Sequence, residues 1–329
     1  MGRLLLTTCL FTLATYVGIH MRMPLVPLYA GTLGADKAEV GLINAGFMIV
    51  AAVASIPLSL ASDRVGRKPL VVFGVASAGV VSLALPLAKT PLALGLLYLA
   101  AGVGVGAFFP AMMALVTDVA GASRAGQAYG WLTLSTQMGM SLGPTVGGVV
   151  ADALGYASAF LVSGALVLAC AALMHLELPT TRPPQTPRAV APLHGVGLLV
   201  RNRLVVAGWL GAMSCTFAWG GLMAFFPLYG QDLGLSTGLI GALLGVHAVA
   251  NALSRLPAGY VTDRLGRPVP LIVGALLAYA LALNLLGQVA TLPGLGVMAL
   301  VMGGAAGTAF VTLGAVVGSS SDPRLRGLA

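Results

Sequence analysis

Polar side chains set within apolar sequence are the residues here whose types and spacing could do chemistry. His247, Asn251 and Arg255 are spaced by four, so on a helix they lie within about 80° of one another. Histidine titrates near neutral pH, which makes His247 the best candidate for a proton carrier. The alternative is a histidine held by helix packing. For Arg255 the alternatives are contact with a solute and extension of the side chain to nearby headgroups.

A second polar row begins near the N-terminus. Counting about 100° per residue places six side chains on roughly 160° of one helix: Thr8, Thr12, Thr15, Tyr16, His20 and Arg22. Charged residues inside a membrane span are costly and usually face a bundle interior or a water-filled cavity. Arg22 is thus a candidate contact for an anion or a substrate, or a charge partner in the cavity, with extension to the outer headgroups as the alternative.

A charged segment occurs twice, once beginning at Asp63 and once at Asp263. Each aspartate can accept charge-assisted hydrogen bonds from arginines or a helix N-terminus in one conformation and release them in another, which describes a gate latch. The alternative is a topology anchor that holds the loop in the cytoplasm. The residues of the two segments are Asp63, Arg64, Gly66, Arg67, Lys68, Gly259, Asp263, Arg264, Gly266 and Arg267.

The two segments belong to a longer internal repeat. Pro27-Leu28-Tyr29 recurs as Pro227-Leu228-Tyr229, and the match runs without a gap from Pro27 to Arg67. A repeat of this length and register indicates that one half of the protein is a copy of the other. The charged segments should therefore occupy equivalent positions in the two halves.

The composition is that of a polytopic membrane protein. The 329 residues are 58% hydrophobic and 8% charged, with a mean hydropathy of +0.97, whereas a soluble domain has roughly 25% charged residues. Apolar runs of about 20 residues, long enough to cross the hydrocarbon layer as helices, recur along the chain. The net charge of +8 does not indicate a nucleic-acid partner, because most Lys and Arg lie on one side if the N-terminus is cytoplasmic.

Ten transmembrane helices are predicted, and the fold class is all-α. The expected spans are 4–29, 38–61, 69–88, 91–117, 128–151, 156–177, 204–229, 237–261, 269–289 and 293–318. The polar stretch 178–203 is predicted to be a cytoplasmic linker between a six-helix bundle (1–177) and a second bundle (204–329). The three cysteines fall inside apolar runs, so neither a disulfide framework nor a metal site is expected.

The predicted fifth span has a seam of small residues. Its members are Gly139, Gly143, Pro144, Gly147 and Gly148, and they should let a neighbouring backbone approach closely. Another face of the same helix carries Gln137. The side chains predicted to line an apolar cavity with a few polar groups are Tyr16, His20, Arg22, Asn44, Gln137, Trp219, His247, Asn251 and Arg255.

These motifs together resemble the major facilitator superfamily of secondary transporters. Its loop signature, approximately G-x-L-a-D-R-x-G-R-K, maps onto the segment from Asp63 to Lys68, with Ser59 at the usual leading glycine. Its fifth-helix signature, G-x-x-x-G-P-x-x-G-G, typical of antiporter branches, is matched in full by the glycine seam. The resemblance implies two six-helix bundles that alternate access to a central cavity.

The sequence also departs from that family. Ala100 stands where antiporters often have an arginine in helix four, and the first span has no acidic residue. The sequence ends after the tenth span, so helices eleven and twelve are expected to be missing. A truncated frame or fragment is favoured over a ten-helix variant.

The expected function is secondary active transport of a small, apolar or amphipathic molecule, in the outward direction and by proton antiport. A uniporter or importer of sugars or organic ions is an alternative, and a non-transporting sensor or inactive truncated remnant is another. Neither an enzyme nor a cofactor is expected. The predicted form is a monomer in the plasma (inner) membrane, with a cytoplasmic N-terminus.

Overall fold

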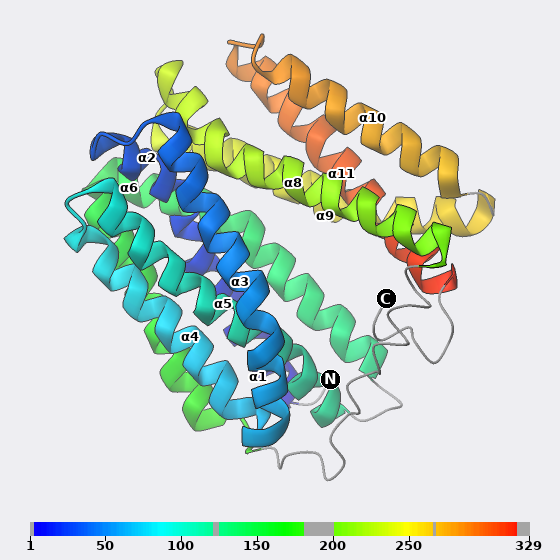
Figure 1. Cartoon of the computed structure of the whole chain (residues 1–329), viewed down its shortest axis with the longest axis horizontal. Coiled ribbons are helices and arrows are strands. Elements are labelled where there is room, and N and C mark those ends of the chain that lie inside the picture. The colour runs from blue at the N-terminus through cyan, green and yellow to red at the C-terminus, as the bar shows by residue number, and fades with distance from the viewer. Residues whose placement is uncertain (1–2, 121–124, 181–200, 266–267, 321–329) are drawn as a thin grey trace. The chain divides into compact units, whose positions relative to one another are not determined.

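The computed structural model describes residues 3–120, 125–180, 201–265 and 268–320. Every regular element in these ranges is a helix (Figure 1). In chain order they are α1 (Arg3–Arg22), α2 (Leu25–Thr32), α3 (Lys37–Val65), α4 (Arg67–Ala84), the short 3₁₀ helix η1 (Leu85–Leu87), α5 (Pro91–Ala120), α6 (Ala125–Glu177), α8 (Arg203–Asp232), α9 (Thr237–Leu265), α10 (Pro268–Leu286) and α11 (Leu292–Ser320).

The first predicted span is broken between α1 and α2. Pro24, which has no N–H to donate to the His20 carbonyl, stands directly before α2. The Met23 N–H donates to that carbonyl instead, at 3.3 Å. The chain therefore stays apolar from residue 4 to residue 32 but changes helix after Arg22.

A glycine divides α6 into two helices. Gly155 has φ 81° and ψ 165°, a conformation outside the helical region that glycine adopts without steric cost. The parts before and after it correspond to the predicted spans 128–151 and 156–177. Nine helices of the described chain are long and apolar enough to cross a membrane, and the break in α6 makes ten crossings. The all-α membrane fold is confirmed.

Large apolar side chains cover the outside of these helices. Leu42 is 72% exposed, Leu256 82% and Phe217 83%. Such exposure is what a lipid-facing surface requires, because hydrocarbon tails solvate these groups as well as a protein core does.

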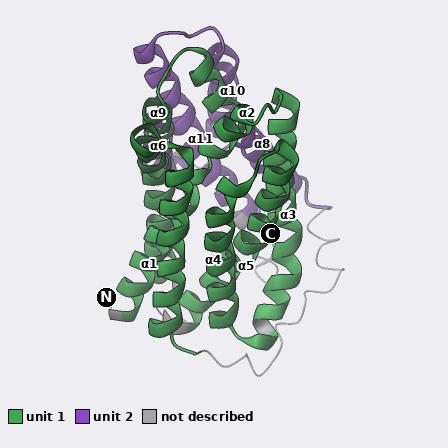
Figure 2. Cartoon of the chain, turned by 90° about the vertical axis from the view of Figure 1, so that its left-hand side faces the viewer, with its two compact units in different colours: residues 1–185, 223–245 green, residues 186–222, 246–329 purple. Residues whose placement is uncertain are grey.

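The chain forms two compact units, coloured separately in Figure 2. Unit 1 comprises residues 1–185 and 223–245, and its core gathers buried side chains of α1, α4, α5 and α6 around Phe108 and Val75. Unit 2 comprises residues 186–222 and 246–329, where Leu313 of α11 packs with Cys215 of α8 and Ile272 of α10. Residues 223–245, the end of α8 and the start of α9, are called the 223–245 hairpin below; they pack within unit 1.

Candidate functional site

The first charged segment is anchored by Arg67. Its side chain is 6% exposed, and its Nε donates to Asp118 Oδ2 of α5 at 3.2 Å. Its Nη1 donates to Ser62 Oγ of α3 at 3.3 Å. Because Arg67 is the first residue of α4, this one guanidinium joins the ends of three helices, α3, α4 and α5. Arg64 is exposed and Lys68 half-buried, and the side chain of Asp63 lies outside the described part of the structure.

The turn at this segment needs a glycine. Gly66 has φ 107° and ψ 158° and separates α3 from α4. A side chain is strained at this φ, so the chain can reverse direction here only with glycine. Its counterpart Gly266 is not among the described residues, nor is Arg267.

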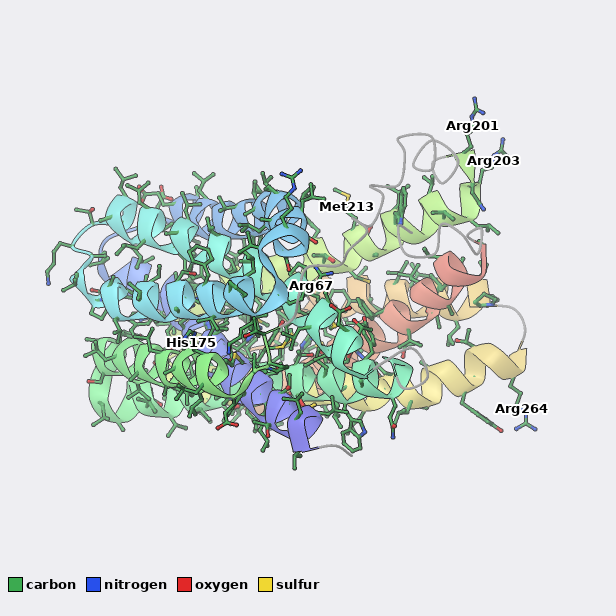
Figure 3. All side chains as sticks on the ribbon, turned by 90° about the horizontal axis from the view of Figure 1, so that it is seen from below. Arg67, His175, Arg201, Arg203, Met213 and Arg264 are labelled. Atoms are coloured by element: carbon green, nitrogen blue, oxygen red, sulfur yellow. The ribbon has the colours of Figure 1, made fainter. Side chains whose placement is uncertain are left out.

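The second charged segment shows a different arrangement. Arg264 is exposed, donates to the Tyr260 hydroxyl at 2.9 Å and lies over that ring at 5.8 Å. Figure 3 shows Arg264 extending away from the end of α9, whereas Arg67 lies against the helices around it. Gly259 is half-buried and has room beside it, since an added Cβ would meet nothing nearer than Val311 Cγ1 at 3.8 Å. The Asp263 side chain lies outside the described set.

The glycine seam of α6 has α1 packed against it. A Cβ added at Gly143 would come within 2.6 Å of His20 Cβ and 2.8 Å of the Val17 carbonyl oxygen. At Gly139 it would meet Tyr16, and at Gly147 it would meet the backbone of Met21. These three glycines thus let α1 lie directly on α6.

A second edge of the seam packs against α9. A Cβ at Gly148 would collide with the Thr237 carbonyl oxygen, and the carbonyl oxygen of Pro144 occupies the space beside Gly241. Thr145 Oγ1 donates to the Gly241 carbonyl oxygen at 3.2 Å. The seam therefore joins the first sequence repeat to the 223–245 hairpin, which comes from the second.

Asp152 fastens the same contact and was not predicted from the sequence to be a site residue. Its Oδ1 accepts from the Thr237 N–H at 2.8 Å, and its Oδ2 accepts from the Gly238 N–H at 2.7 Å. These are the first two amides of α9, which have no partners inside the helix. The carboxylate also complements the positive end of the helix dipole. Asp152 follows the seam by one turn, a position that could have drawn attention, but nothing in the sequence names its partner.

One ion pair accompanies this contact. Lys37 Nζ lies 3.4 Å from Asp232 Oδ2, with both side chains more than half exposed. Asp152, Lys37 and the turn between α8 and α9 thus lie at one end of unit 1, called the Gly155 end. The end that holds Arg67 and Asp118 is called the Arg67 end.

Arg22 is buried in the interior of unit 1. Its exposure is 0%, and its Nη1 donates to the Ala78 carbonyl oxygen at 2.8 Å and to Ser82 Oγ at 2.6 Å, both on α4. The Tyr98 ring of α5 lies 5.9 Å from its Cζ. Extension to the headgroups, the alternative for Arg22, is therefore wrong.

Tyr16 and His20 lie beside the seam. Their rings stack at 5.4 Å, and His20 Nδ1 is 3.0 Å from the Tyr16 carbonyl oxygen. His20 is 7% exposed, and Tyr16 also contacts Phe108 of α5 at 5.9 Å between ring centroids. The predicted polar row of α1 thus turns inward, toward α4, α5 and α6.

The α9 row lies in unit 2. His247 is 3% exposed, and its Nε2 is buried without a hydrogen-bonding partner among the described residues. Arg255 donates from Nε and Nη2 to Asn251 Oδ1 at 3.2 and 3.0 Å, and its guanidinium lies 4.8 Å from the Phe310 ring centroid. The α9 backbone lies against α11, since the carbonyl oxygens of His247 and Asn251 abut glycines of that helix, and Arg255 reaches Phe310 on it.

The remaining cavity candidates are half-buried. Asn44 donates to the Val40 carbonyl oxygen at 3.0 Å, within its own helix. Gln137 lies on α6 and Trp219 on α8. The structure therefore groups Tyr16, His20 and Arg22 in unit 1, and His247, Asn251 and Arg255 in unit 2. No three metal-ligating side chains gather at one point among the residues described.

Comparison with known proteins identifies the family. The model of the Major Facilitator Superfamily matches residues 7–329. The chain belongs to the major facilitator superfamily. It is accordingly a multi-pass membrane transporter, and the resemblance inferred from the duplicated loop and the glycine seam is confirmed.

Individual members differ considerably in sequence. An uncharacterized MFS-type transporter of Methanocaldococcus jannaschii is 25% identical over 268 residues, which cover 80% of this chain and 69% of that one. The multidrug resistance protein MdtG of Serratia proteamaculans is 28% identical over 307 residues, which cover 89% of this chain and 73% of that one.

Solved structures share the fold. A bacterial homolog of the human lysosomal transporter Spinster superimposes with a TM-score of 0.83 at 17% identity, covering 98% of this chain and 76% of that one. The nucleoside transporter NupG gives a TM-score of 0.76 at 15% identity, covering 99% of this chain and 84% of that one.

Proposed function

We propose that this transporter exports a small apolar or amphipathic molecule by alternating access, driven by proton antiport. Support for export comes from the multidrug resistance relatives at 25–28% identity and from the complete fifth-helix signature. We further propose that it acts as a monomer in the plasma (inner) membrane, with the N-terminus and the 178–203 linker cytoplasmic. The basic residues of the two charged segments and the linker support this orientation.

The contact between α6 and α9 carries the mechanistic part of the proposal. It joins the first repeat to the 223–245 hairpin through backbone-to-backbone packing and the Asp152 hydrogen bonds. A pathway cannot open at the Gly155 end while this contact persists. Its rupture and re-formation are therefore a natural step of alternating access.

The Arg67 end has its own fastening. The guanidinium of Arg67 ties α4 to α3 and α5, and we propose that these bonds hold the end of the first bundle rigid. A rigid end can move as one body, which is what rocking of a bundle requires. We propose that Asp63 acts here as a gate residue, and that Asp263 does so in the equivalent segment of the second half.

His247 is the proposed proton carrier. All described acidic residues lie at or near helix ends, and the sequence of the first span contains none. The imidazole of His247 is buried, and its Nε2 has no partner among the described groups. A neutral buried imidazole that gains a proton in one conformation and loses it in the other would couple transport to the proton gradient.

The test is efflux of a fluorescent amphipathic dye from proteoliposomes under an imposed proton gradient. We expect the gradient to accelerate dye movement in the wild type, and His247→Gln to abolish that acceleration. The matched control is His175→Gln, because His175 is exposed in the last turn of α6. Dye movement that is equal with and without the gradient would refute proton coupling.

A second candidate function is uniport or import of sugars or organic ions. The missing acidic residue in the first span favours it, because no carboxylate is available there to carry the proton. Counterflow of labelled solute without any gradient would support uniport. Gradient-driven dye efflux would exclude it.

A further inference from the structure

Arg22 occupies an unusual position for a charged residue. It is the last residue of α1, ten residues before the end of the first apolar span at Thr32. Its side chain is fully buried. The fold therefore keeps a guanidinium out of reach of solvent, which is destabilising unless the charge is compensated.

Within the described part of the chain, only one nitrogen of this guanidinium has a hydrogen-bonding partner. Nη1 donates to the Ala78 carbonyl oxygen and to Ser82 Oγ. Nε and Nη2 are buried and have no acceptor among the described residues. The N–H bonds of Nε and Nη2 point the same way along one edge, the geometry that binds the two oxygens of a carboxylate.

No charge among the described side chains balances Arg22. The groups that face it are the Ala78 carbonyl, the Ser82 hydroxyl and the Tyr98 ring, with His20 two residues away on α1. None of these is an anion at neutral pH. Arg67 provides the contrast within the same chain, because it is almost equally buried and pairs with the carboxylate of Asp118.

An aromatic pair completes the surroundings. The rings of Tyr98 and Phe47 stack at 4.4 Å between centroids, and both side chains are buried. Tyr98 lies near the guanidinium, and Phe47 comes from α3. An apolar wall beside a bidentate cation suits a carboxylate attached to an apolar body.

We propose that Arg22 is the binding site for the carboxylate of a small, apolar organic acid, held by Nε and Nη2. The proposal deepens the proposed function, on which it rests, by naming a carboxylate as a feature of the transported molecule or of a bound co-ligand. Because Arg22 is fully buried here, the ligand reaches it only when α1 separates from α4 and α5. Occupancy is thus coupled to the conformational state of the transporter.

Thermal unfolding of the full chain in detergent tests the site, with benzoate as the probe. Benzamide serves as the neutral isostere, and sodium chloride keeps the ionic strength constant. We expect benzoate to raise the Tm and benzamide to leave it unchanged. No response to benzoate, or an equal response to benzamide or to added chloride, would overturn the proposal.

Three variants locate the effect. Arg22→Met should have a higher Tm than the wild type without benzoate, because it removes an uncompensated charge, and should no longer respond to benzoate. Arg22→Lys keeps the charge but loses the two-pronged edge, so its benzoate affinity should fall about tenfold or more. Arg67→Met should lower the Tm yet keep the full response. A benzoate response retained in both Arg22 variants would refute the assignment.

Labelled benzoate in proteoliposomes identifies the source of the carboxylate. Movement of the label through the wild type and not through Arg22→Met would place the carboxylate on the transported molecule. Binding without movement, together with an altered rate of dye efflux, would identify a bound co-ligand. Absence of dye efflux would count against the export function alone, because the Tm measurement requires no transport.

Discussion

At the residue scale, two arginines of unit 1 show how differently the same group can be used. Arg67 has a carboxylate at 3.2 Å and a hydroxyl at 3.3 Å, so its burial is compensated within the protein. Arg22 has only dipoles around it in the described part of the chain. A paired buried arginine stabilises a helix junction, whereas an unpaired one stays available to a ligand.

The Arg67–Asp118 pair makes a prediction at this scale. Arg67→Met should lower the free energy of unfolding by about 1–2 kcal/mol, a modest figure because Asp118 remains 48% exposed and solvent screens the pair. Asp118→Asn should cost at least as much, because it leaves the buried Arg67 guanidinium without its carboxylate, and the double variant should cost less than the two single costs added. Thermal unfolding of all four proteins gives the coupling energy. Strict additivity would show that the pair contributes no interaction of its own.

At the element scale, the packing of α6 follows from where its glycines lie. Gly139, Gly143 and Gly147 face α1, while Gly148 faces α9. Spacing by four predicts a flat edge on the helix but does not say which helix will occupy it. The partner depends on long-range topology, and only the structure supplied it.

A single methyl group on this edge should be costly. In Gly147→Ala the new Cβ would meet backbone atoms of Met21, which cannot move aside as a flexible side chain would. We expect a loss of about 1–3 kcal/mol in the free energy of unfolding. Gly130→Ala is the control, since nothing lies within 4 Å of its added Cβ and alanine favours helix. Equal stability of the two variants in a thermal unfolding experiment would contradict close α1–α6 packing.

The sequence was sufficient for the spans and for the break between residues 151 and 156, but not for the break within the first span. Hydropathy predicted the ten crossings, because it depends on local composition. The end of α1 at Arg22 was missed, since the apolar run continues unbroken past Pro24. The sequence also left undecided whether Arg22 points into the bundle, because periodicity defines a face of a helix without identifying the neighbour that packs against that face. The role of Asp152 was not predicted for the same reason, because its partner Thr237 is 85 residues away in the sequence.

At the scale of the whole molecule, the contact at the Gly155 end joins parts of the two sequence repeats. Backbone packing between α6 and the 223–245 hairpin supplies the surface, and the two hydrogen bonds of Asp152 supply a polar fastening. The Lys37–Asp232 pair is exposed and should contribute little, because surface ion pairs are typically worth under about 1 kcal/mol.

Removing the carboxylate should make this end open more often. Asp152→Ala loses the cap on α9, worth about 1 kcal/mol, which corresponds to roughly a fivefold shift in the opening equilibrium. The measurement is the rate of maleimide labelling at a buried Ser141→Cys thiol, in a background whose three native cysteines are replaced. Lys37→Gln is the matched control and should change the rate less than about twofold. A labelling rate unaffected by Asp152→Ala would show that the cap does not restrain this end.

The partnership of Asp152 with α9 also bears on how the protein is made. Chains are synthesised from the N-terminus, so Asp152 and the rest of α6 are made before Thr237, which lies 85 positions after Asp152. During that interval the Pro144 and Gly148 surface has no neighbour from the second repeat. The packing of the first repeat is therefore completed only when the 223–245 hairpin of the second repeat has been made. Two separately translated halves would have to associate in the bilayer before this contact could form.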